Sequence, residues 1–256
     1  MRSVKTLILA AALAFGVAGA AQANEGVELP QQAWPHAGPF GKLDQAAARR
    51  GFQVYNEICK NCHSLNLGAF RNLQGIGFTE AQVKEIAAQY DVDAEPNDEG
   101  KVLKRKAIPS DRFVKPFEND KAARAANAGA LPPDLSVIIK ARHDGENYVT
   151  ALLTGYEDTP AGATVPEGKY YNKYFPGHSI GMPQMLFDDS VTYTEAGAPK
   201  ATALQEAKDV ATFLSYMSEP TQDERKSLGI KVMIFLVVFS GLMFACKRKL
   251  WSDVGH

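Results

Sequence analysis

Two cysteines and a histidine stand at a spacing that suits one particular chemistry. The 256-residue chain contains the sequence Cys59-Lys60-Asn61-Cys62-His63. Cys-X-X-Cys-His is the attachment sequence of a c-type haem, in which the two thiols form thioethers with the porphyrin vinyl groups. The histidine that follows ligates the iron from the proximal side. We therefore predict one covalently bound haem c per chain, held by Cys59 and Cys62, with His63 as an axial iron ligand.

Other uses of this cysteine pair fit the sequence less well. A zinc ribbon requires a second Cys/His pair, whereas the third and last cysteine, Cys246, lies in a distant apolar stretch. A thioredoxin-like pair is expected between a strand and a helix, but this motif follows a helical pattern. A disulfide between Cys59 and Cys62 would be strained at this spacing. Haem attachment is therefore the favoured interpretation.

The amino-terminal end has the pattern of a secretory signal. Arg2 and Lys5 precede an apolar run, and Ala21-Gln22-Ala23 follows it. A positive region, an apolar region and a small-residue cleavage site together predict a signal peptide over residues 1–23. Export also suits c-type haem attachment, and it predicts a haem domain outside the cytoplasm over residues 24–222.

A second apolar run near the carboxyl end predicts a membrane anchor. Residues 228–246 are uncharged except for Lys231, and Lys247, Arg248 and Lys249 follow at once. Nineteen helical residues span about 28 Å, close to the thickness of a hydrocarbon core. The basic flank predicts a cytoplasmic tail over residues 247–256, with residues 223–227 as a membrane-proximal linker. The expected location is a bacterial inner or intracytoplasmic membrane, crossed once, with the haem domain in the periplasm.

Charge is divided unevenly along the chain. The net charge of the whole chain is −1, but residues 24–222 carry −6 while the two flanks carry +2 and +3. An acidic soluble domain argues against a nucleic-acid partner and suits a basic protein partner. General solvation explains the charge equally well. The acidic stretch 91–99 is expected to be a solvated loop or a docking patch.

Hydrophobic periodicity predicts a mainly α-helical domain with long irregular loops. Segments 64–78 and 155–200 are expected to be irregular from their content of Gly, and of Gly, Pro and Tyr, respectively. The length of the second segment is acceptable because a haem replaces much of the core that such a loop lacks. The last soluble helix has a predicted buried stripe that includes Leu204, Val210 and Leu214. The predicted helices cover residues 43–58, a segment that starts at Thr79, and residues 121–127, 135–142, 146–153 and 202–217.

The sixth iron ligand has several candidates in the sequence alone. Met182 and Met185 lie in a loop rich in Gly and Pro, and His178 lies in the same loop. His36 and His143 are further histidines outside the predicted signal and tail. Methionine ligation raises the haem potential relative to bis-histidine ligation, but methionine is more often a core filler than a ligand. The residues alone leave these alternatives open.

The chain as a whole resembles the cytochrome c1 family. The resemblance covers nearly all of the predicted mature chain, and its fragments occur in the order that the family shows. The chain departs from the family pattern at residues 181–185, where it has Gly-Met-Pro-Gln-Met and the family commonly has Gly-Met-Ala-Pro-Pro. The matching fragments are residues 50–55, 122–127, 129–136, 141–143 with Tyr148, 153–156, 174–177, 180–182, 208–210, 219–220 and 249–252.

This resemblance implies a fold and a set of roles. It implies a class I cytochrome c-like haem domain with one carboxyl-terminal transmembrane helix, and it implies Met182 as the second axial ligand. Arg142 is expected to pair with a haem propionate, which an always-charged guanidinium can stabilise. Asn127 and Tyr148 are expected beside the haem. Pro132 and Pro133 are expected to form the wall near His63, where a backbone carbonyl can orient the imidazole.

The resemblance also implies a function and partners. The chain is expected to accept one electron from the Rieske iron–sulfur protein of a bc1 complex and to pass it to a soluble or anchored cytochrome c. Cytochrome b, the membrane and a dimeric complex are the other expected partners. The chain would be an electron-transfer subunit rather than an enzyme on its own, while the complex is a quinol–cytochrome c reductase. A membrane-anchored monohaem cytochrome serving another complex is the alternative.

Overall fold

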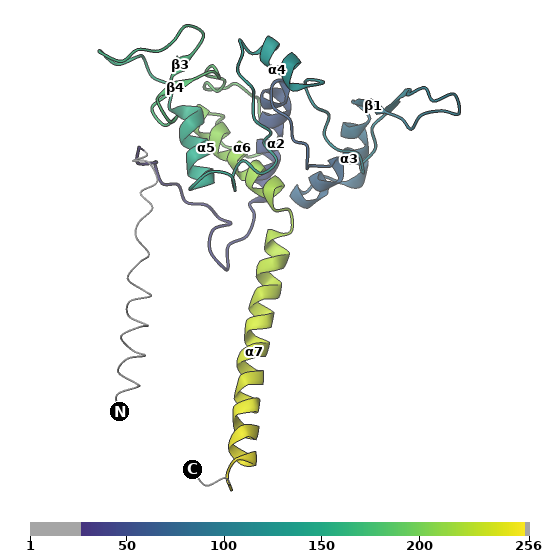
Figure 1. The fold of residues 1–256 in the computed structure, drawn as a ribbon, viewed down its shortest axis with the longest axis vertical. Helices are drawn as coiled ribbons and strands as arrows, with labels where there is room; N and C mark the ends of the chain where they lie inside the picture. The colour runs from purple at the N-terminus through teal and green to yellow at the C-terminus, as the bar shows by residue number, and fades with distance from the viewer. Residues whose placement is uncertain (1–26, 254–256) are drawn as a thin grey trace, which may run out of the picture.

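A computed structural model describes residues 27–253, and the predicted signal peptide lies outside this range. Figure 1 shows a helical body from which one long helix, α7, extends. The helices are α2 (Gln45–Glu57), α3 (Glu80–Ala87), α4 (Asp120–Ala126), α5 (Gly145–Thr154), α6 (Ala203–Ser218) and α7 (Gln222–Leu250), with 3₁₀ turns η1 (Cys59–Asn61) and η2 (Phe70–Ile76). The strands are β1 (Asp91–Asp93) paired with β2 (Lys104–Lys106), and β3 (Tyr170–Tyr171) paired with β4 (Ser179–Ile180), both antiparallel. The mainly α-helical class is confirmed.

Helix starts follow the capping signals of the sequence. Asp44 accepts a hydrogen bond from the Ala47 backbone N–H at 3.0 Å, at the start of α2. Thr79 begins α3 with a capping box, because its side chain and that of Gln82 satisfy each other's backbone N–H groups. Thr202 caps α6 in the same position relative to its helix. Each cap satisfies a backbone donor that the helix itself leaves free.

The predicted helix over residues 135–142 is wrong. This segment forms a series of turns that follow on from Asp134. The Leu135 backbone N–H donates to the Ser64 carbonyl at 2.9 Å, and the Ser136 N–H donates to Asp134 Oδ1 at 2.9 Å. The first bond ties the segment to the chain that follows the Cys-X-X-Cys-His motif, and the second closes a local turn. Tertiary pairing has therefore overridden a weak helical pattern.

Two further expectations are corrected by the structure. The stretch 91–99 is not entirely a loop, because its first three residues form β1, and Asp91 and Asp93 form ion pairs with Lys106 and Lys104 at 3.0 and 2.5 Å. Each pair lies directly across the two-stranded ribbon, where opposite charges attract. Leu204, expected in the buried stripe of the last soluble helix, is 47% exposed in the first turn of α6.

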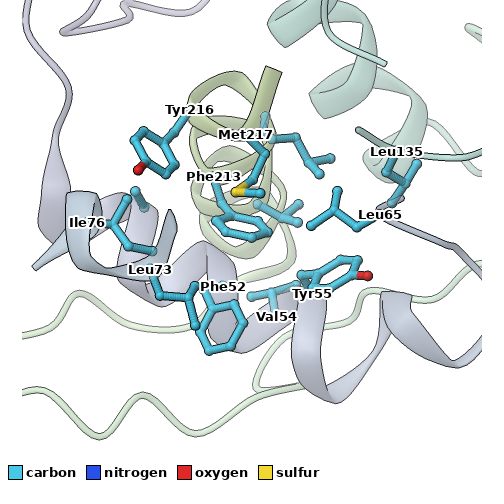
Figure 2. Packing of buried hydrophobic residues seen from close by; sticks show 14 of the residues in the cluster. Phe52, Val54, Tyr55, Leu65, Leu73, Ile76, Leu135, Phe213, Tyr216 and Met217 are labelled. Carbon is cyan, nitrogen blue, oxygen red and sulfur yellow. The ribbon is translucent and has the colours of Figure 1, made fainter. Parts of the chain in front are cut away.

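The core is built on the crossing of α2 and α6. Figure 2 shows Phe52 and Tyr55 of α2 turned toward Phe213 of α6, with ring centroids 5.6 Å apart for both pairs. The helices approach closely at Gly51, where an added Cβ would lie 1.9 Å from the Asp209 carbonyl oxygen.

A buried ion pair fixes the register of the same crossing. Arg50 Nε and Nη2 each donate to one oxygen of the Asp209 carboxylate at 2.8 Å, and Tyr193 Oη donates to the same group. Asp209 is 1% exposed. A bidentate pair of this kind is directional, because both N–H groups must meet both oxygens.

The long helix α7 is tied to the body at its first turns. Glu219 accepts hydrogen bonds from Lys140 Nζ at 2.8 Å and from Arg225. Asp223 accepts from the Leu43 backbone N–H at 3.2 Å. The predicted linker 223–227 is helical, so α7 runs without a break through the predicted transmembrane segment. Among residues 27–253, α7 alone is long and apolar enough to cross a membrane.

Replacement of Gly51 by Ala should destabilise the fold. Alanine gains about 1 kcal/mol of helix propensity, but its Cβ would overlap the Asp209 backbone and force α2 and α6 apart. Overpacking of a close contact costs about 1–3 kcal/mol, and more where backbone must move. We expect a net loss of about 1 kcal/mol or more in chemical denaturation of the detergent-solubilised protein. The control Glu57→Ala, on the exposed side of α2, should not lower stability comparably; equal losses would contradict the close-approach argument.

The Glu219 cluster should make stability depend on acid pH. Hydrogen bonds from Arg225 and Lys140 lower the pKa of Glu219 to about 2. Because the folded-state pKa lies below the ordinary value of 4.5, the stabilisation is complete above that value and is lost as pH falls toward 2. The Tm difference between the native chain and Glu219→Gln should therefore shrink between pH 6 and pH 3. A difference that stays constant over this range would contradict the assignment.

Candidate functional site

The residues singled out in the sequence gather around one cavity. The cavity has a volume of about 500 Å³. Its walls come from segments that are far apart in the sequence. They are the Cys-X-X-Cys-His motif, residues 127–142, helix α5, residues 175–186 and helix α6. All nine predicted site residues line it: Cys59, Cys62, His63, Asn127, Pro132, Pro133, Arg142, Tyr148 and Met182.

The remaining wall of the cavity is largely apolar and includes one face of each of two helices. Val149, Leu152 and Leu153 of α5 face it, as do Val210 and Leu214 of α6. The hydrophobic periodicity of α6 predicts that Val210 and Leu214 are buried. It does not predict that they line a cavity, which only the structure shows. A large apolar cavity with a few polar groups is typical of a cofactor site. Its size and lining suit a flat, mainly apolar macrocycle such as haem.

The motif cysteines are presented by a tight turn at the end of α2. The helix ends at Glu57, and η1 follows directly. The backbone N–H groups of Cys62 and His63 both donate to the Cys59 carbonyl, at 3.1 and 2.9 Å. This turn brings both sulfur atoms and the imidazole to the same cavity. Cys59 and Cys62 are not joined to each other by a disulfide.

The His63 imidazole is held by a backbone carbonyl. Its Nδ1 lies 2.8 Å from the Pro133 carbonyl oxygen. Since a carbonyl can only accept, Nδ1 carries the proton and Nε2 keeps its free lone pair. Burial lowers the pKa of His63, although the Pro133 carbonyl opposes this shift. A neutral imidazole with a free Nε2 is the form that can ligate a metal.

Asp134 joins the two chain segments that make this contact. Its carboxylate accepts hydrogen bonds from Ser64 Oγ at 2.7 Å, from the Asn66 N–H at 2.8 Å and from the Ser136 N–H at 2.9 Å. Burial alone would raise the pKa of Asp134, but these hydrogen bonds outweigh it and lower the pKa. These three hydrogen bonds to Asp134 keep Pro133 next to His63. Sequence reasoning missed Asp134 as a positioning residue, although it follows the Pro-Pro pair directly.

Met182 reaches the cavity from a loop that a tyrosine holds in place. Tyr156 Oη donates to the Met182 carbonyl at 2.9 Å. Burial raises the pKa of Tyr156, so its hydroxyl remains a donor. Gly181 lies so close to Ala130 that an added Cβ would stand 2.9 Å from the alanine side chain. Sequence reasoning had noted Tyr156 only as part of a family fragment.

The other ligand candidates are placed differently. Met185 also lines the cavity but is 37% exposed. His178 does not line it; its ring stacks on Tyr171 with centroids 5.6 Å apart. His36 is buried elsewhere, next to Glu146, and His143 is an exposed residue outside the cavity lining. Within residues 27–253, the structure therefore brings two methionines and no second histidine to the cavity.

The polar residues at the cavity are available to a ligand to different degrees. Asn127 ends α4 and uses its side-chain N–H to bind the Ala123 carbonyl at 2.7 Å. Arg142 donates to the Ala141 carbonyl, and within residues 27–253 its guanidinium forms no ion pair. An unpaired guanidinium at an apolar cavity suits an incoming carboxylate.

Comparison with known proteins identifies the family of this chain. The cytochrome C1 family profile matches residues 34–254. The chain is 46% identical over 270 residues to cytochrome c1 of Rhodospirillum rubrum, covering 99% of this chain and 98% of that protein. It is 50% identical over 233 residues to the mitochondrial cytochrome b-c1 complex catalytic subunit of Candida albicans, covering 91% of this chain and 80% of that protein.

A third relative is longer than this chain. The cytochrome b/c1 protein of Bradyrhizobium diazoefficiens is 47% identical over 270 residues, covering 96% of this chain, which spans 39% of the length of that protein. These matches confirm the family predicted from the sequence. The chain belongs to the cytochrome c1 family and is a haem c-binding electron-transfer protein, with one helix, α7, that is long and apolar enough to cross a membrane.

Proposed function

We propose that this chain accepts one electron from the Rieske iron–sulfur protein and passes it to a cytochrome c. The observation that carries the proposal is the single cavity shared by the Cys-X-X-Cys-His motif and Met182. A six-coordinate iron with His and Met ligands suits electron transfer at a relatively high potential. No bond of a substrate is broken by this subunit, and the reductase activity belongs to the assembled complex.

The residues of the cavity would bind, orient and shield the cofactor. Cys59 and Cys62 would hold haem c through thioethers, while His63 and Met182 would ligate its iron. Bound haem supplies a reversible one-electron couple, whose potential depends on the axial ligands and on burial. Pro133 orients His63 through the 2.8 Å hydrogen bond to Nδ1. The apolar faces of α5 and α6 exclude water from the ring.

Arg142 is proposed to bind a haem propionate. Its guanidinium lines the cavity and pairs with no carboxylate within residues 27–253. An ion pair with a propionate would offset the cost of holding that charge in a partly dry site. Asn127, Tyr148, Pro132 and Pro133 complete the proposed haem environment, since all four line the cavity.

Met182 is favoured over Met185 as the axial ligand. Both methionines line the cavity, but the Met182 backbone is held by Tyr156 and lies next to the tightly packed Gly181. Met185 is more than a third exposed. A ligand must keep its sulfur at one position, and a held backbone serves this better than an exposed side chain.

The partners and the location follow from the same proposal. Cytochrome b and the Rieske protein are the expected neighbours in the complex, and the Bradyrhizobium relative carries both cytochrome b and c1 in its name. A dimeric complex is proposed from the family resemblance. The basic residues 247–249 favour a cytoplasmic carboxyl end, and we therefore propose a haem domain in the periplasm, anchored to a bacterial inner membrane.

The tip of the β1–β2 hairpin is the proposed docking patch for a basic cytochrome c. Asp91 and Asp93 are paired with lysines across the ribbon. The acids at the tip, Glu95, Asp98 and Glu99, form no ion pair among the described residues and are exposed. Asp188 and Asp189 are two further acids of the soluble domain that could steer a basic partner, but they are engaged locally by the Ala203 N–H and by Lys200 at 3.9 Å. The unpaired tip acids are the better steering group.

Substitution of Met182 should lower the haem potential. Met182→His would replace a thioether by an imidazole, and we expect the midpoint potential to fall by roughly 0.1 V or more within the ~0.8 V range that axial ligands set. Redox titration and the methionine–iron charge-transfer band of the oxidised protein provide the measurement. Met185→Leu is the matched control and should leave both nearly unchanged. If Met185→Leu abolished the band while Met182→His retained it, the ligand assignment would be reversed.

Neutralisation of the hairpin tip should slow docking of a basic cytochrome c. The triple variant Glu95→Gln, Asp98→Asn, Glu99→Gln should reduce the association rate about 3- to 10-fold at low ionic strength and flatten its salt dependence. Stopped-flow reduction of a basic cytochrome c measures this rate.

The control for the docking patch removes the same charge elsewhere. Glu157→Gln, Asp158→Asn, Glu167→Gln neutralises three exposed acids of a different loop and should have a smaller effect. Equal effects of the two triple variants would mean that only net charge matters, and the docking patch would be rejected.

A further inference from the structure

Phe40 is held in an unusually exposed position. Its side chain is 79% exposed, the highest value among the large apolar side chains of residues 27–253. It belongs to a compact turn of residues 35–42, which we call the Phe40 turn. The Ala37 N–H donates to the Trp34 carbonyl at 2.9 Å, and the Lys42 N–H donates to the Pro35 carbonyl at 3.0 Å. The turn therefore has defined internal bonds that leave the phenyl ring outside.

The Phe40 turn is tied to both the body and α7. His36 is buried, and its Nε2 lies 3.1 Å from Glu146 of α5 and 3.2 Å from Ser215 of α6. Lys226 of α7 donates through Nζ to the carbonyls of His36 and Gly41. Figure 1 shows this part of the amino-terminal arm, in purple, descending from the body toward the start of α7.

These contacts fix the height of the turn along α7. The apolar run of α7 begins at Leu228, two residues after Lys226, which is about 3 Å farther along the helix axis. The Gly41 carbonyl is 3.3 Å from Lys226 Nζ, and Gly41 is the residue next to Phe40. The exposed ring therefore lies close to the level at which α7 enters the hydrocarbon of a membrane.

We propose that the Phe40 turn is a second membrane attachment of this chain, with Phe40 inserted into the interfacial layer of the lipid bilayer. The partner is lipid, because the turn continues the surface that α7 already presents to the membrane. Aromatic and apolar side chains gain free energy by leaving water for this layer. The backbone of the turn is already held by hydrogen bonds, so insertion of the ring costs little additional conformational entropy.

A second attachment would constrain the orientation of the haem domain. A single helix leaves the body free to rotate about the axis of α7 and to tilt together with it in the membrane. The Phe40 turn lies on the amino-terminal arm and touches lipid at a second point, so it would limit that movement. The cavity would then keep a steady height and direction relative to partners in the same membrane. This consequence goes beyond the electron-transfer role and does not depend on which methionine ligates the iron.

Site-directed spin labelling can test the proposal. The full-length haem-loaded chain with Cys246→Ser, which removes the one cysteine outside the motif, receives Phe40→Cys and is reconstituted in phosphatidylcholine–phosphatidylglycerol vesicles. Power saturation should show greater accessibility to oxygen than to a water-soluble nickel chelate at position 40. The matched control Val102→Cys, 51% exposed on the β1–β2 hairpin, should show the reverse. The same aqueous pattern at both positions would overturn the proposal.

A second labelling site allows the Phe40 ring to be kept or removed. The label is attached at Ala37→Cys, an exposed neighbour on the turn, in one protein that retains Phe40 and in a second that carries Phe40→Ser. Lipid contact predicts that the oxygen-to-nickel accessibility ratio at position 37 falls severalfold when the ring is removed. An unchanged ratio would contradict a role for Phe40.

The occupant can be identified in the assembled complex. Benzoylphenylalanine placed at position 40 in the complex should cross-link to phospholipid on illumination. A cross-link to a neighbouring protein subunit would show that protein covers the ring and would reject the lipid assignment. The unaltered absorbance of the bound haem in every variant serves as the check that the domain is folded.

Discussion

The crossing of α2 and α6 is the contact on which the rest of the structure depends. Gly51 permits the two backbones to approach, and the bidentate pair between Arg50 and Asp209 fixes how they are aligned. The carboxyl end of α2 then delivers Cys59 to the cavity, while the adjoining face of α6 supplies Val210 and Leu214. One helix crossing therefore sets the distance between the attachment motif and the opposite wall of the site.

The buried ion pair between Arg50 and Asp209 contributes more to the selection of one alignment of α2 and α6 than to the free energy of folding. Both partners lose hydration, and the attraction between them recovers that cost only when the geometry is good. Here both oxygens of Asp209 are engaged, and Tyr193 adds a third donor. A crossing shifted by one turn would leave a buried charge without a partner. The pair therefore selects one alignment of the helices, and with it one shape of the cavity.

The irregular segments around the cavity are ordered by polar contacts instead of secondary structure. Asp134 gathers the chain after His63 and the Pro-Pro segment through three hydrogen bonds. Tyr156 holds the loop of Met182 in a similar way. Such loops have little apolar core of their own, and a bound haem supplies the missing packing surface. This arrangement explains how long irregular segments can hold two proposed ligands on either side of one cofactor.

The sequence by itself determined the attachment chemistry, the helical class, the apolar carboxyl-terminal helix and most helix starts. These features depend on residues that are close together in the sequence, such as Cys59 with Cys62 and His63, or the capping pair of Thr79 and Gln82. Such residues stay close together in space in any fold, so the sequence alone is sufficient to recognise them. Only the tertiary structure decided that residues 135–142 are turns and that His178 lies away from the cavity. It also decided which groups hold His63 and Met182. Those outcomes depend on pairing between distant segments, and such pairing leaves no periodic trace in a single sequence.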